Sequence, residues 1–72
     1  MSMEQITNEQ LREFLMWYRV HYRKDMGFEA ALQMSMMGQF HITVKQTRPL
    51  IQRCLNLGYI QKTVNAYVRI MV

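Results

Sequence analysis

The strongest structural signal in the chain is the segment Arg48-Pro-Leu-Ile-Gln-Arg-Cys-Leu-Asn-Leu-Gly58-Tyr-Ile60. Its apolar residues recur at helical spacing and would form the inner face of a helix. Pro49 has no amide hydrogen and fits the first turn of a straight helix, which makes Thr47 the natural N-cap. Gly58 is typical of the position that ends a helix. The segment therefore predicts a helix over about residues 47–57.

The residues that follow this helix are typical of a β-hairpin. Residues 59–64 and 67–72 are rich in β-branched and aromatic side chains, which favours two strands. Asn65-Ala66 lies between them and would form the turn. We therefore expect a hairpin over about residues 59–72, directly after the helix.

Residues 40–46, just before the helix, fit two interpretations. Apolar and polar residues alternate here, as they do in a short strand. Thr43 followed by Gln46 has the spacing of a capping box, as at the start of a helix. If the helix begins at Thr43, Pro49 must kink it. The sequence leaves open whether this segment is a strand, a turn or a helix start.

Two further helices are predicted upstream. The first covers about residues 8–24, with Thr7 as N-cap because Gln10 completes a capping box. Asp25-Met26-Gly27 should break this helix, with Gly27 in a left-handed capping position.

The second predicted helix is shorter and rich in methionine. It covers about residues 28–37 and should end at Gly38. It contains the segment Met34-Ser-Met-Met37, of which one or two methionines would face the core.

This order of elements, and above all the junction Gly58-Tyr-Ile60, resembles the winged helix-turn-helix family. In that family the recognition helix ends in an apolar residue, a Gly and another apolar residue, and runs directly into the β-wing. The resemblance covers about residues 8–72. It implies a mainly α, α+β fold, with three helices and a C-terminal hairpin in one winged-helix domain (1–72). It also implies a bacterial or phage transcriptional regulator or architectural protein that binds double-stranded DNA, with the helix at 47–57 in the major groove.

The distribution of charge agrees with a polyanionic partner. The chain has a formal net charge of +4. All five acids lie within residues 1–29, whereas residues 30–72 contain five basic residues and no acid. A half of one sign concentrates positive potential, which favours binding to nucleic acid.

One face of the third predicted helix carries residues that suit base recognition. At 100° per residue, Arg48, Gln52 and Asn56 share the face opposite the apolar one. Lys45 joins them if the helix extends back that far. Arg, Gln and Asn side chains make paired hydrogen bonds to guanine or adenine edges. We call these four residues the polar stripe.

Three more residues are predicted to contact phosphates. Thr47 would donate at the start of the helix, beside free backbone amides. Arg53 lies at the edge of the polar stripe, and Lys62 lies near the tip of the predicted wing. The positive charge of Arg53 suits a phosphate, and Lys62 would contact the DNA backbone or the minor groove.

The sequence contains no motif for catalysis, a cofactor or a metal. His21, His41 and Cys54 lack the spacing of metal ligands, and we expect Cys54 to be a buried, inert thiol. There is no Gly-rich phosphate loop. A single cysteine excludes an internal disulfide, and we find neither a signal segment nor an apolar run of about 20 residues. The prediction is a cytoplasmic protein that is not an enzyme and has no cofactor, metal or membrane partner.

Surplus apolar residues suggest contacts with proteins. Met16, Trp17 and Val20 lie outside the main apolar face of the first helix. They are candidates for a contact in a homodimer or cooperative oligomer, since a DNA half-site is short. The alternative function is a small protein-interaction module that binds no nucleic acid. In it, Trp17 and the segment Met34-Ser-Met-Met37 would present an apolar surface to a partner.

Overall fold

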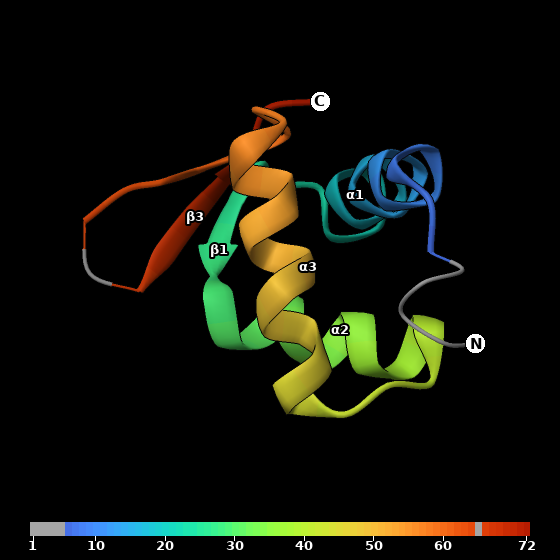
Figure 1. Cartoon of the computed structure of the whole chain (residues 1–72). Helices are drawn as coiled ribbons and strands as arrows, with labels where there is room; N and C mark the ends of the chain where they lie inside the picture. The colour runs from blue at the N-terminus through green and yellow to red at the C-terminus, as the bar shows by residue number, and fades with distance from the viewer. Residues whose placement is uncertain (1–5, 65) are drawn as a thin grey trace.

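The computed structural model describes residues 6–64 and 66–72. Its elements are α1 (Asn8–Tyr22), β1 (Met26–Phe28), α2 (Glu29–Phe40), α3 (Val44–Asn56), β2 (Ile60–Lys62) and β3 (Tyr67–Ile70) (Figure 1). The strands form an antiparallel sheet in the order β1-β3-β2, so β3 is the central strand. The α+β class, with three helices before the hairpin, is therefore as predicted.

Helix α1 begins as expected but ends two residues early. The Thr7 side chain accepts the Gln10 N–H at 3.1 Å, and the Gln10 side chain accepts the Thr7 N–H at 2.8 Å. This reciprocal capping box satisfies two amides that the first turn leaves without partners. At the other end Arg23, with φ 55°, takes the left-handed position. The prediction that Gly27 would take it is wrong, because Gly27 lies in β1.

Strand β1 was not predicted. It pairs with β3 in the register Met26↔Arg69 and Phe28↔Tyr67. The Ile70 N–H donates to the Asp25 carbonyl at 2.6 Å, next to the ladder. A three-residue strand is too short to show a period of its own, so it is detectable only through its partner strand.

Helix α2 extends past its predicted end. Leu32, Met36 and Phe40 are buried at a spacing of four residues, which keeps the C-terminal turn on the core. Gly38 therefore lies inside the helix, and the prediction that it ends the helix is wrong. His41, with φ 55°, ends it instead.

Helix α3 begins at the capping box that the sequence left as one alternative. The Gln46 N–H donates to the Thr43 side chain at 3.3 Å, and the Gln46 side chain accepts the Thr43 N–H at 2.9 Å. Thr43 is thus the N-cap, and the predicted N-cap at Thr47 is wrong. Pro49 lies inside the helix and gives the Lys45 carbonyl no helical hydrogen bond.

A glycine turn joins α3 to the hairpin, as predicted. Gly58 has φ 76°, a left-handed conformation that favours glycine. The Tyr59 N–H donates to the Cys54 carbonyl at 2.9 Å and closes the last turn of α3. The strands are shorter than predicted, and the predicted turn residue Asn65 lies outside the described residues. The hairpin projects away from the helices (Figure 1).

The core lies between the three helices and one face of the sheet. Its members are Ile6, Leu11, Phe14, Leu15, Tyr18, Leu32, Met36, Phe40, Ile42, Leu50, Ile51, Cys54, Ile60, Val68 and Ile70. On β3, Val68 and Ile70 face this core while Arg69 between them is exposed, as the alternation of a strand requires. Over the described ranges, none of the helices has the length and apolar character needed to cross a bilayer.

Candidate nucleic-acid interface on helix α3

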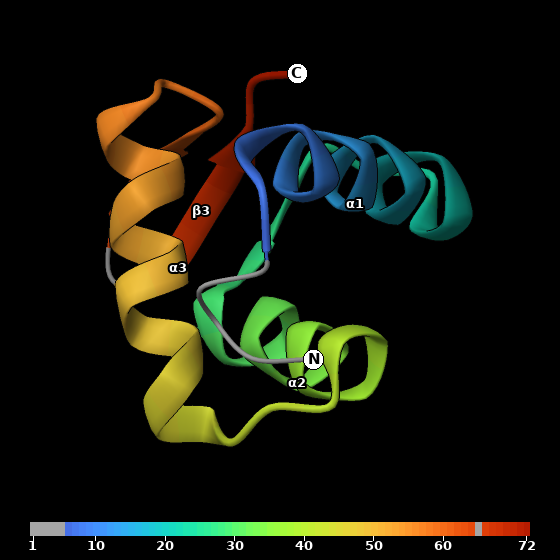
Figure 2. The same ribbon diagram turned by 45° about the vertical axis from the view of Figure 1, so that its right-hand side comes forward.

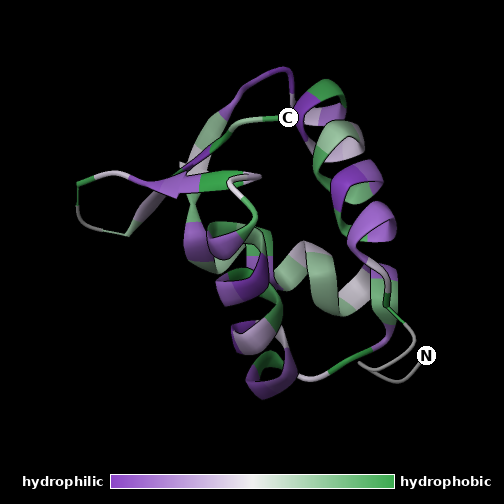
Figure 3. Ribbon diagram, turned by 45° about the horizontal axis from the view of Figure 1, so that its top comes forward, coloured by the Kyte–Doolittle hydropathy of each residue, from purple (hydrophilic) through white to green (hydrophobic). Residues whose placement is uncertain are grey.

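The polar stripe forms on the outer face of α3. Lys45, Arg48, Gln52 and Asn56 are all exposed, whereas Leu50, Ile51 and Cys54 on the opposite face are buried. Because α3 begins at Thr43 rather than Thr47, the helix does extend back far enough to include Lys45. Figure 3 shows hydrophilic bands along α3 beside the more apolar α2. The structure thus brings the four predicted residues onto one accessible surface.

A hydrogen bond orients two members of the stripe. The Gln52 Nε2 donates to the Asn56 Oδ1 at 3.0 Å. This leaves the Gln52 Oε1 as an acceptor and the Asn56 Nδ2 as a donor. A donor and an acceptor side by side are what an adenine edge requires in the major groove.

A groove of about 400 Å³ adjoins the stripe, between α2, α3 and β2. Its lining residues are Glu29, Gln33, Val44, Arg48, Ile51, Gln52, Leu55 and Lys62. Lys62 reaches the groove because it lies opposite Val68, which faces the core. The structure therefore brings Lys62 next to Arg48 and Gln52, as a site that includes the hairpin requires.

Glu29 is a member of this groove that the sequence analysis missed. Its Oε1 lies 3.9 Å from the Lys62 Nζ. Glu29 stands in the first turn of α2, where a carboxylate interacts favourably with the helix dipole. The only sequence signal was that Glu29 is the last acid before residues 30–72, which contain no acidic residue. A carboxylate here opposes the binding of a polyanion.

The predicted phosphate contact of Thr47 is wrong, because its side chain is fully buried. The Thr47 hydroxyl donates to the Val44 carbonyl and accepts a hydrogen bond from the Gln33 Nε2 at 2.9 Å. It therefore links α2 to α3 and has no access to a ligand.

Arg53 also serves a contact inside the protein. Its Nη1 donates to the Ile6 carbonyl at 2.7 Å, and the residue is half-buried. This bond fastens the segment before α1 to α3. This bond uses one of the guanidinium donors, and the predicted phosphate contact of Arg53 stays a prediction.

The apolar residues proposed for protein contacts divide into two groups. Met16, Trp17 and Val20 are exposed on α1, and their role in an oligomer stays a prediction. On α2, Met36 is in the core and Met37 is half-buried, so Met34 alone is exposed in the methionine-rich segment. Of the methionine-rich segment, Met34 and in part Met37 are therefore accessible, and the alternative function stays a prediction.

The remaining candidate chemistry is buried or dispersed. Burial raises the pKa of the Cys54 thiol to about 11, despite the opposing effect of the Arg53 charge. The thiol is thus protonated at neutral pH and weakly nucleophilic. Within residues 6–64 and 66–72, no three His, Cys, Asp or Glu side chains gather as a metal site would require.

Comparisons with protein-family models, curated proteins and solved structures found no match to this chain. The residues themselves therefore indicate the function. The polar stripe and Lys62 beside it are held together by the packing of α2, α3 and β2.

Proposed function

We propose that the chain is a winged-helix protein that binds double-stranded DNA, with α3 in the major groove and the β2–β3 hairpin as the wing. The observation that carries this proposal is the exposed polar stripe with Lys62 next to it. These residues belong to the half of the chain that contains no acid. A transcriptional regulator or an architectural DNA-binding protein would need this arrangement.

The dimensions of α3 suit the proposed role. A helix with its side chains is about 10–12 Å wide, and the major groove of B-DNA is about 12 Å wide. In helix-turn-helix proteins the N-terminal residues of the recognition helix contact base edges. Lys45 and Arg48 lie in that part of α3, so Arg48 is the candidate for a guanine contact. Gln52 is then the candidate for the next base, and Lys45 and Lys62 for phosphates.

Salt dependence is the first test of the proposal. Binding to a random-sequence duplex should weaken log-linearly with salt, with a slope of about −0.9 for each neutralised phosphate. Two to three contacts from Lys45, Arg48 and Lys62 give a slope of about −2 to −3, or up to roughly a 40-fold loss between 50 and 200 mM salt. Fluorescence anisotropy of a labelled duplex measures both the affinity and its dependence on salt concentration. An absence of binding at 50 mM salt would refute the proposal.

Glu29→Gln should strengthen DNA binding. The substitution removes a carboxylate from the groove and frees Lys62 for a phosphate, so we expect about a fivefold gain in affinity at 0.1 M salt. Little stability should be lost, because the Lys62–Glu29 pair is partly exposed.

Glu9→Gln is the matched control for Glu29→Gln. It makes the same change in net charge in the first turn of α1, outside the groove. An equal gain in affinity from the two substitutions would show that only net charge matters. In that case Glu29 does not lie at the DNA interface.

A second candidate function uses α1 and not α3. Val20 is 71% exposed and Trp17 46% exposed, and at three residues apart on α1 they present adjacent apolar surface. In a DNA-binding protein this surface, together with Met16, is our candidate for a contact between two copies. In a protein-interaction module it would receive another protein.

A further inference from the structure

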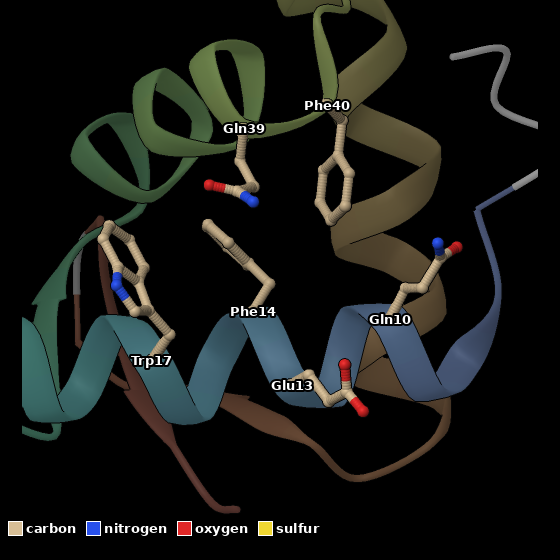
Figure 4. Close-up of a pocket in the computed structure, with 6 residues that line it drawn as sticks. All are labelled: Gln10, Glu13, Phe14, Trp17, Gln39 and Phe40. Atoms are coloured by element: carbon tan, nitrogen blue, oxygen red, sulfur yellow. The ribbon is translucent and has the colours of Figure 1, made fainter.

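A second cavity, of about 380 Å³, lies between α1 and the C-terminal end of α2. Its lining residues are Gln10, Glu13, Phe14, Trp17, Gln39 and Phe40 (Figure 4). None of them belongs to α3 or to the sheet. In Figure 2, α1 and α2 lie to the right and α3 lies to the left. The cavity is therefore separate from the proposed DNA interface.

The exposed Trp17 indole and the nearly buried Phe14 and Phe40 rings form the apolar walls of this cavity. The Phe14 ring centroid lies 5.5 Å from that of Phe40 and 6.1 Å from that of Trp17. The His21 ring stacks on Trp17, with centroids 4.8 Å apart and an interplanar angle of 16°. This stack covers one face of the exposed indole.

The polar lining is negative. Glu13 is the charged residue of the lining. Figure 4 shows its carboxylate in front of α1, outside the space between the aromatic rings. Among the residues that the structure describes, no cation lies within 4.0 Å of its carboxylate. The Gln39 amide points toward the Phe14 ring. Rotation about its last torsion brings either its oxygen or its nitrogen to a ligand.

We infer that this cavity binds an organic cation, that is, an ammonium or guanidinium group. The π-system of the exposed Trp17 indole attracts cations, and the Glu13 carboxylate in the lining supplies the counter-charge. An anion has no basic partner in the lining. The volume lies within the range of small-ligand sites. This inference does not depend on the proposed DNA binding.

Two sources supply this chemistry. One is a free quaternary or primary ammonium compound. The other is a lysine or arginine side chain of a protein, including a second copy of this basic chain. The half-open shape of the cavity admits the tip of a side chain as well as a free molecule, so the probes must include both.

Trp17 gives a direct test, since it is the one tryptophan of the chain. Choline should shift or quench its fluorescence with a millimolar dissociation constant, as a few cation–π contacts and one carboxylate allow. The uncharged isostere 3,3-dimethylbutan-1-ol should bind at least about tenfold more weakly. The indole N–H signal in NMR, recorded in the same titration, detects a ligand that is silent in fluorescence.

Glu13→Gln isolates the electrostatic part of the site. Both residues are exposed, so Glu9→Gln on the same helix is the control outside the cavity. Glu13→Gln should weaken choline binding about tenfold, leave the isostere unchanged and leave DNA affinity equal to that of Glu9→Gln. N-acetylarginine amide distinguishes the sources. Tighter binding than choline assigns the site to a protein side chain, and weaker binding assigns it to a free cation.

The inference is overturned by any of three results. The first is that choline and its isostere bind equally well. The second is that Glu13→Gln and Glu9→Gln have the same effect on choline binding. The third is that neither Trp17 signal changes with choline or the arginine probe up to about 100 mM, well above a millimolar dissociation constant.

Discussion

The double variant Lys45→Ala/Arg48→Ala is expected to bind a random-sequence duplex roughly 60-fold more weakly than the unmodified chain at 0.1 M salt. A slope of about −0.9 for each phosphate corresponds to about eightfold in affinity for each contact at this salt concentration, and the two factors multiply. The slope itself should become less negative by about 1.8. Both side chains are exposed and make no hydrogen bond or ion pair among the described residues, so the fold should persist.

The matched control for this variant is Arg12→Ala/Arg19→Ala. These two arginines are exposed on α1, and their removal lowers the net charge by the same amount. The control should lose little affinity, because only charges near the DNA neutralise phosphates. If both double variants lose affinity equally, binding follows net charge and α3 is not the recognition helix. If a specific site is selected later, Arg48→Ala alone should also relax specificity at one base pair.

The variant Phe14→Ala is expected to lose about 3–5 kcal/mol of unfolding free energy, the cost of removing a well-packed buried phenyl ring. Phe14 is almost fully buried, and its ring lies next to those of Tyr18 and Phe40. Its contact with Phe40 joins α1 to α2. Small domains have roughly 0.05–0.15 kcal/mol of stability per residue, which is about 4–11 kcal/mol for 72 residues. The variant should therefore retain between none and about 8 kcal/mol of this stability.

Urea denaturation followed by far-UV circular dichroism measures this loss. Val20→Ala is the control, because Val20 lies on the same helix and is mostly exposed. It should change the unfolding free energy by no more than about 0.5 kcal/mol. A loss below about 1 kcal/mol for Phe14→Ala would contradict the packing of α1 on α2 through this ring.

The capping-box spacing in the sequence predicts where a helix begins when no contact between distant residues affects that position. The Thr7–Gln10 capping box was identified directly, since both bonds join residues three apart. The start of α3 could not be decided, because Pro49 favoured Thr47 and the capping box favoured Thr43. What decides it is the burial of Thr47 against Gln33, a contact between residues 14 positions apart.

The part of the candidate site that lies on one helix, α3, was predictable from the sequence. The 100° rule placed Arg48, Gln52 and Asn56 on one exposed face, as the structure has them. The role of Arg53 depends on a hydrogen bond to Ile6, 47 positions away. The approach of Glu29 to Lys62 depends on the packing of α2 beside the sheet. Contacts between residues this far apart in the sequence cannot be predicted from the local pattern of residues.

The central position of β3 has a consequence for folding during synthesis. β1 and β2 emerge from the ribosome first, but each is hydrogen-bonded only to β3 in the sheet. Met26 pairs with Arg69 in the β1–β3 ladder, so this ladder cannot form until Arg69 has been synthesised. Synthesis from the N-terminus therefore produces the three helices before β3. The apolar core residues of the helices that pack against Val68 and Ile70 stay exposed until residue 70 has left the ribosomal exit tunnel. The sheet therefore forms only once β3 has been synthesised, rather than strand by strand, and the nascent chain before that point is the form most exposed to chaperones and proteases.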